Sequence, residues 1–139
     1  MISAKGGTMA YNNSFEDIAI PGVDTEKACQ IYHGDREFFI CVLRIFANGA
    51  KDLTDALRKV SNDNLSDYAI NIHGLKGACA NICADALALR ARELEADAKS
   101  GDLRRVLALN GALLDDVESL IHNICNIREV RDEVQDSHL

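Results

Sequence analysis

Residues 65–82 read LSDYAINIHGLKGACANI, and this segment carries the clearest helical pattern in the chain. Its apolar side chains recur at alternating intervals of three and four residues, at Leu65, Tyr68, Ile72, Leu75, Cys79 and Ile82. That spacing is typical of an α-helix that presents one narrow apolar seam to other helices. Polar residues at 62–64 directly precede the stretch and can cap its first turn. The sequence therefore predicts a helix from Leu65 that packs against other helices.

Two further helical patterns lie before this stretch. Asp24 or Thr25 can cap a short helix that runs to about Tyr32. Asp35 can cap a longer helix whose apolar positions fall on one face, namely Phe38, Val42, Ile45, Leu53, Leu57 and Val60.

Two more helical patterns follow it. The first ends at Ser100-Gly101 and has the seam Leu87, Ala91, Leu94 and Ala98. Asp102 can cap the second, whose seam is Val106, Leu109, Leu113, Val117, Leu120, Ile124 and Ile127. The sequence has no strand alternation and no hairpin turn signal, and short connections make neighbouring helices antiparallel. We therefore expect an all-α fold, an antiparallel up-down four-helix bundle with a short additional N-terminal helix.

Length and composition set the boundaries of this bundle and exclude several classes of function. The chain has 139 residues, which is about one domain. We expect the bundle in residues 20–131, a flexible linker or cloning remnant in 1–19 and a frayed tail in 132–139.

A net charge of −7 argues against nucleic-acid binding. No apolar run approaches the roughly 20 residues needed to insert in a membrane. Five cysteines without a CxxC pair, in a chain with no secretory signal, indicate free thiols and a cytoplasmic location.

His73 is the side chain best suited to chemistry. On a helical wheel it points away from the apolar seam and stands at the edge of the bundle. Most of its surface neighbours are small, and Gly77 leaves room beside the ring. Lys76, three residues on, places a positive charge next to whatever the imidazole holds. A histidine nucleophile beside an ammonium group suits an incoming phosphoryl group, whose charge spreads over several oxygens.

Hairpin geometry points to a carboxylate partner for this histidine. If the chain reverses near Ala84, residue 73 lies level with residue 95, which is Glu95. A carboxylate bonded to Nδ1–H would fix the tautomer, leave Nε2 free to attack and stabilise a cationic ring.

The segment His73-Gly74-Leu75-Lys76-Gly77 resembles the HxLKG signature of the histidine-containing phosphotransfer (HPt) domain. The resemblance covers about residues 20–125 and includes Ile20-Pro21-Gly22-Val23-Asp24, Gly34-Asp35, Ala80-Asn81 and Ala91-Arg92-Glu93-Leu94-Glu95. The first of these is similar to the opening of HPt domains at the C-terminal end of hybrid sensor kinases. The resemblance implies a four-helix bundle that carries phosphate on Nε2 of the motif histidine and exchanges it with an aspartate of a receiver domain.

Carried over residue by residue, the resemblance makes His73 the phosphoacceptor, Lys76 the charge stabiliser and Gly77 the clearance residue. Some members of the family have Glu or Gln at the position of Glu95, bonded to the other ring nitrogen. One position departs from the family pattern: Cys83 stands where a second glycine is usual, and we expect an altered turn or packing there.

We expect the partner to be a response-regulator receiver domain. We expect the protein itself to be a monomer that binds no cofactor and no metal. The expected docking surface combines nearby surface of the second helix, which Asp35 caps, with a small-residue patch: Ser66, Ala69, Ile70, Gly74, Gly77, Ala80 and Asn81. No nucleotide-binding loop is present, so autonomous kinase activity is not expected. A di-iron site is disfavoured, since Glu118 and His122 are four residues apart and not three. The alternative is a helical adaptor or dimerisation bundle without chemistry at His73.

Overall fold

The structure is a computed structural model that describes residues 15 and 17–130. This part of the chain is helical and contains no strand. Its elements, in chain order, are α1 (Thr25–Ile31), α2 (Arg36–Leu57), the short 3₁₀ helix η2 (Asn62–Asn64), α3 (Leu65–Asn81), α4 (Asp85–Lys99) and α5 (Leu103–Cys125). The predicted all-α fold is confirmed.

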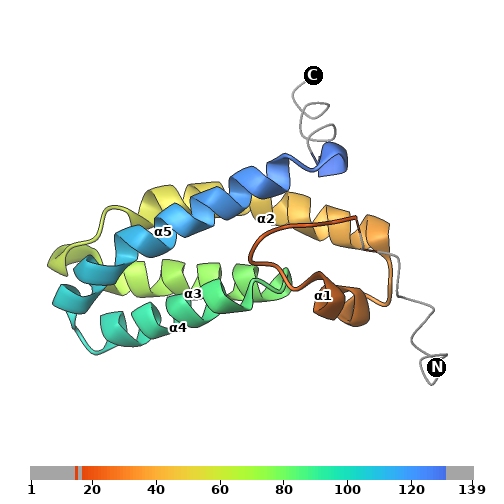
Figure 1. Ribbon diagram of the computed structural model, residues 1–139. Helices are drawn as coiled ribbons and strands as arrows, with labels where there is room; N and C mark the ends of the chain where they lie inside the picture. The colour runs from red at the N-terminus through yellow and green to blue at the C-terminus, as the bar shows by residue number, and fades with distance from the viewer. Residues whose placement is uncertain (1–14, 16, 131–139) are drawn as a thin grey trace.

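The four long helices enclose one core. Helix α2 packs against α3 and α5, and α4 packs against the same two helices. In Figure 1 the colour gradient runs in opposite directions along successive helices, and α1 lies at one end of the bundle beside the α3–α4 connection. None of the helices formed by the described residues is long and apolar enough to cross a bilayer.

Aspartate side chains set the starts of three helices. The carboxylates of Asp24, Asp35 and Asp102 each accept a hydrogen bond from the backbone N–H three residues on, at 3.0–3.1 Å. Each bond satisfies one of the N–H groups that the first turn of a helix leaves without an intrahelical partner. The starts of α1, α2 and α5 are therefore encoded locally, as the sequence predicted.

Helix α1 and the segment before it cover the open end of the bundle. The backbone N–H of Asp24 donates to the carbonyl oxygen of Cys83 at 3.0 Å, and the Tyr32 hydroxyl donates to the carbonyl oxygen of Asn81 at 2.6 Å. Both acceptors lie at the C-terminal end of α3, where carbonyl groups lack partners within the helix. Lys27 adds an ion pair with Asp85 at 2.8 Å. The short N-terminal helix thus holds the α3–α4 turn in place.

Ordered packing starts ahead of the expected boundary at residue 20. Phe15 is buried and stacks on Phe39 with ring centroids 4.9 Å apart, and Ile18 is buried as well. These are isolated apolar residues without helical periodicity, so a pattern search passes over them. Residues 1–14, residue 16 and the expected tail lie outside the described residues.

The apolar face expected for α2 is partly wrong. Phe38 and Ile45 are 51% and 66% exposed, whereas Phe39, Leu43 and Phe46 fill the core. The helix carries apolar residues on more than one stripe, and spacing alone does not say which stripe faces inward. The stripe that includes Val42 and Ile45 is left at the surface of the bundle.

The seam of α5 also differs from the prediction at one position. Leu109 is 42% exposed and Asn110 is buried in its place. The Asn110 side chain accepts a hydrogen bond from the Tyr68 hydroxyl at 2.8 Å and donates to the carbonyl oxygen of Leu57 at 2.9 Å. Leu57 ends α2, so its carbonyl has no partner within the helix. A polar side chain at a core position therefore joins α2, α3 and α5 through hydrogen bonds.

Candidate functional site

His73 stands on the outer side of α3, where the α3–α4 pair meets solvent. Its neighbours in sequence Ile72 and Leu75 are fully buried, while its own side chain is 64% exposed. The narrow seam of α3 accounts for this contrast, because residues off the seam turn outward.

Glu95 projects from α4 onto the same edge. Its Oε2 lies 2.9 Å from Nδ1 of His73, although the two residues are 22 positions apart. The carboxylate is nearly enclosed, with 7% of its side chain exposed. The α3–α4 hairpin thus brings together the imidazole and the carboxylate that the sequence places level with each other.

Two lysines also contact this carboxylate. Nζ of Lys76 lies 2.9 Å from Oε1 of Glu95, and Nζ of Lys99 lies 2.8 Å from Oε2. Hydrogen bonds from Lys76, then from Lys99, and a smaller one from His73, outweigh desolvation and lower the pKa of Glu95 to about 2. Glu95 is therefore ionised throughout the physiological pH range. Sequence reasoning missed Lys99, although its i,i+4 spacing from Glu95 on α4 is a recognisable signal.

The ionised carboxylate determines which ring nitrogen of His73 carries the proton. An ionised carboxylate can only accept hydrogen bonds, so the contact with Glu95 requires the hydrogen on Nδ1. In the neutral imidazole, Nε2 then has a free lone pair on the opposite side of an exposed ring. The arrangement suits a nucleophile whose ring can become cationic without losing its partner.

The surface around His73 is open, with one correction to the predicted patch. Ala69 is buried and belongs to the hydrophobic core. The other members are exposed, namely Ser66, Ile70, Gly74, Gly77, Ala80 and Asn81. A Cβ atom built on Gly77 would meet no atom within 4 Å. The glycine is therefore not required by packing within the protein.

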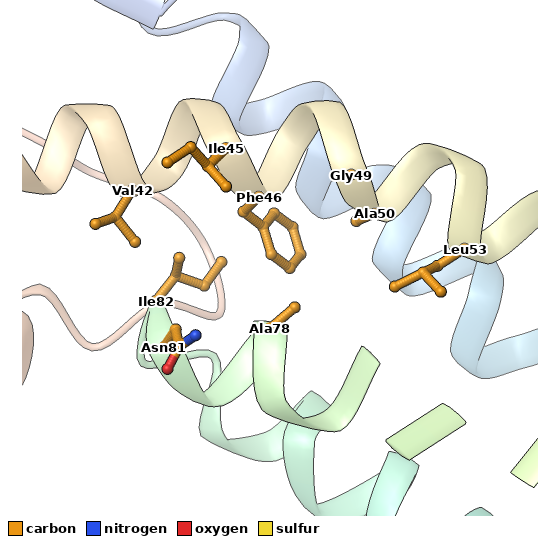
Figure 2. Close-up of a pocket in the computed structure, with 9 residues that line it drawn as sticks. All are labelled: Val42, Ile45, Phe46, Gly49, Ala50, Leu53, Ala78, Asn81 and Ile82. Carbon is orange, nitrogen blue, oxygen red and sulfur yellow. The ribbon is translucent and has the colours of Figure 1, made fainter. Parts of the chain in front are cut away.

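An apolar groove of about 210 Å³ runs between α2 and the last turns of α3. Figure 2 shows that α2 supplies Val42, Ile45, Phe46, Gly49, Ala50 and Leu53, while the end of α3 supplies Ala78, Asn81 and Ile82. Leu53, which lines the groove, also lies 3.9 Å from a Cβ placed on Gly74. The misassigned face of α2 thus forms one wall of a groove whose other wall is the end of α3.

Cys83 keeps the turn conformation that a glycine would adopt. Its φ is +62°, and it follows the last residues of α3. The N–H groups of Cys83 and Ala84 donate to the carbonyl oxygens of Ala80 and Cys79, at 3.0 and 2.9 Å, which is a Schellman motif. The expected alteration of the turn is therefore not found in the backbone. The side chain is buried, as is that of Cys79.

Residues 15 and 17–130 hold no group of three or more histidine, cysteine, aspartate or glutamate side chains placed to bind a metal ion. The acidic residues on α5 have basic neighbours, since Arg58 pairs with Asp115 at 2.8 Å and with Glu118 at 3.0 Å. Arg90 pairs with Asp116 at 2.7 Å. These carboxylates form surface ion pairs.

Comparison with known protein families identifies the family to which this chain belongs. The family model described as "Hpt domain" matches residues 42–135. The match starts within α2, so it does not include the Ile20-Pro21-Gly22-Val23-Asp24 segment, and it contains His73, Lys76 and Glu95. Neither the search of curated proteins nor the search of solved structures found a match. Because the family model covers more than half of the chain, the protein belongs to the Hpt domain family, whose members act in histidine phosphotransfer within phosphorelay signalling.

Proposed function

We propose that this protein is a phosphorelay intermediate that accepts a phosphoryl group on Nε2 of His73 from an aspartyl-phosphate receiver domain and passes it to another receiver. The observation that carries the proposal is the contact between Nδ1 of the exposed imidazole and the ionised, nearly enclosed carboxylate of Glu95.

The proposed step is a direct displacement at phosphorus. The lone pair on Nε2 of His73 forms an N–P bond while the P–O bond of the aspartyl phosphate breaks, and the aspartate leaves as a carboxylate. The proton on Nδ1 stays in place, so the phosphorylated ring is cationic. Glu95 stabilises that charge through the hydrogen bond it already accepts. Transfer to the next receiver is the same step in reverse.

Lys76 has the role of stabilising charge on the phosphoryl oxygens. It lies three residues after His73, on the adjacent surface of α3, and its side chain is 29% exposed. An ammonium group at this distance along the helix can reach oxygens that extend outward from Nε2.

The partner surface combines the small residues near His73 with the α2–α3 groove. Gly74 and Gly77 let another backbone approach the imidazole, and the groove offers apolar side chains for a partner to cover. A carrier must release each partner after transfer, so a modest contact area fits this role. We expect the protein to act as a monomer in the cytoplasm, and a place at the end of a larger sensor kinase stays a prediction.

Phosphotransfer from a purified, phosphorylated receiver domain tests the proposal. Wild-type protein should acquire acid-labile, base-stable phosphate, and His73→Ala should acquire none. His122→Ala is the matched control, because His122 is an exposed histidine on α5 away from the α3–α4 edge. If wild type and His73→Ala stay equally unlabelled with a set of receivers, the adaptor alternative replaces the phosphotransfer function.

A further inference from the structure

Two lysines contact the carboxylate of Glu95, although a single lysine would balance its negative charge. Lys76 on α3 and Lys99 on α4 each lie within 2.9 Å of a Glu95 oxygen, and they take different oxygens. The carboxylate is 7% exposed, so water contributes little to its solvation. A carboxylate in such a place needs at least one cation, because a buried charge left unpaired is strongly destabilising.

The two lysines differ in their position relative to His73 and Glu95. Lys76 shares a helix with His73 and lies three residues from it, whereas Lys99 shares a helix with Glu95 and lies four residues from it. The Lys99 pair is therefore local to α4 and does not depend on the position of α3. Phosphorylation of His73 would add up to about two negative charges beside Lys76. Nζ of Lys76 lies 2.9 Å from Oε1 of Glu95, so it must move away from that carboxylate to pair closely with phosphoryl oxygens.

We propose that Lys99 is a positioning residue. It compensates the negative charge of the ionised Glu95 carboxylate while Lys76 moves from Glu95 to the phosphoryl group on His73. This inference rests on the proposed function. With Lys99 in place, Glu95 stays ionised and continues to hold Nδ1 of His73. Without Lys99, releasing Lys76 would leave the carboxylate with the ring of His73 as its one cationic partner, so Glu95 would hold Lys76 more strongly.

Titration of Glu95 tests the shared carboxylate without any phosphotransfer. The side-chain carboxyl carbon is followed by NMR between pH 1.5 and 6, with the pKa of Glu95 at about 2 in wild type. Lys99→Met and Lys76→Met should each raise this pKa, the double variant should raise it most, and Lys99→Arg should stay near wild type. Lys27→Met removes a lysine from the exposed pair with Asp85 and should leave it unchanged. An unchanged pKa in Lys99→Met would overturn the inference.

Phosphorylation kinetics test the transfer of Lys76. Phosphoramidate is the donor: its P–N bond breaks, ammonia leaves and the N–P bond to Nε2 forms. Lys99→Met should slow labelling of His73 about three- to five-fold, and Lys99→Arg should restore it. In a Lys76→Met background, adding Lys99→Met should have less than a two-fold effect, since no lysine then needs release.

The outcomes separate the two proposals. Equal slowing by Lys99→Met in both backgrounds, or none in wild type, would overturn the role of Lys99 while leaving His73 as the phosphoacceptor. Failure of wild-type protein to be labelled by phosphoramidate and by receivers would refute the proposed function itself.

Discussion

Replacing Gly77 with leucine should separate the stability of the protein from its function. Gly77 lies within α3, and a Cβ placed there meets no atom within 4 Å. The first atom of a leucine side chain therefore meets open space, and the substitution removes the backbone entropy cost of a glycine in a helix. Leucine is favoured over glycine in a helix interior by about 0.5–1 kcal/mol. We expect Gly77→Leu to unfold at a temperature about 2–4 °C above wild type.

The same substitution should slow phosphotransfer at least ten-fold. The new side chain occupies the space beside the His73 ring, where a receiver must approach for the N–P bond to form. Misplacing reacting groups by about 1 Å can cost roughly 100-fold in rate. Rates are measured as loss of label from a phosphorylated receiver, and stability is measured by thermal and urea unfolding of the same preparations.

Gly111 offers the matched control for this experiment. It is a glycine within α5, it is exposed, and a Cβ there also meets no atom within 4 Å. Gly111→Leu should gain similar stability and keep the wild-type transfer rate. Transfer by Gly77→Leu within two-fold of wild type would refute the clearance role. A lowered unfolding temperature would show that the space beside Gly77 is not free in solution.

Three further outcomes follow from the groove, the buried polar group and the carboxylate. Ile45→Asp should slow transfer several-fold with little change in unfolding temperature, because Ile45 is 66% exposed and lines the groove; a wild-type rate would exclude the groove from docking. Asn110→Ala should destabilise the protein by about 2–4 kcal/mol in urea unfolding, since the buried Tyr68 hydroxyl and the Leu57 carbonyl lose their partner; a loss under 1 kcal/mol would contradict that bonding. The pKa of Glu95 is lowered to about 2 from an ordinary 4.5, so the stability it contributes is complete above about pH 4.5 and is lost as pH falls toward 2. Glu95→Gln should therefore flatten the stability curve between pH 4.5 and 2, and parallel curves for the two proteins would count against this account.

Much of the fold could be predicted because its signals are local. The capping aspartates and the seam of α3 depend on residues within one or two turns, and the predicted helices appear with starts close to those expected. The inward face of α2 could not be predicted in the same way. Its apolar residues form more than one stripe, and only contact with α3 and α5 decides that Phe46 is buried and Ile45 exposed.

In the candidate site, too, some features could be predicted from local sequence and others could not. The exposure of His73 and the position of Lys76 beside it follow from helical periodicity along one segment. The hairpin argument placed Glu95 at the right level, because a short turn near Ala84 sets the register of two antiparallel helices. The role of Lys99 as a second cation on Glu95 needed side-chain positions from the folded protein, and so did the burial of Ala69.

By itself, the sequence determined where the helices begin, which edge of α3 carries the imidazole, and which family the chain belongs to. These properties depend on neighbours within a few residues or on a short motif, so they are present in the unfolded chain as a pattern. The enclosure of Glu95 by two lysines, and the apolar groove between α2 and the end of α3, could be found only in the folded protein. Burial and charge pairing depend on which surfaces of separate helices meet, and that is settled when the core of the whole bundle packs.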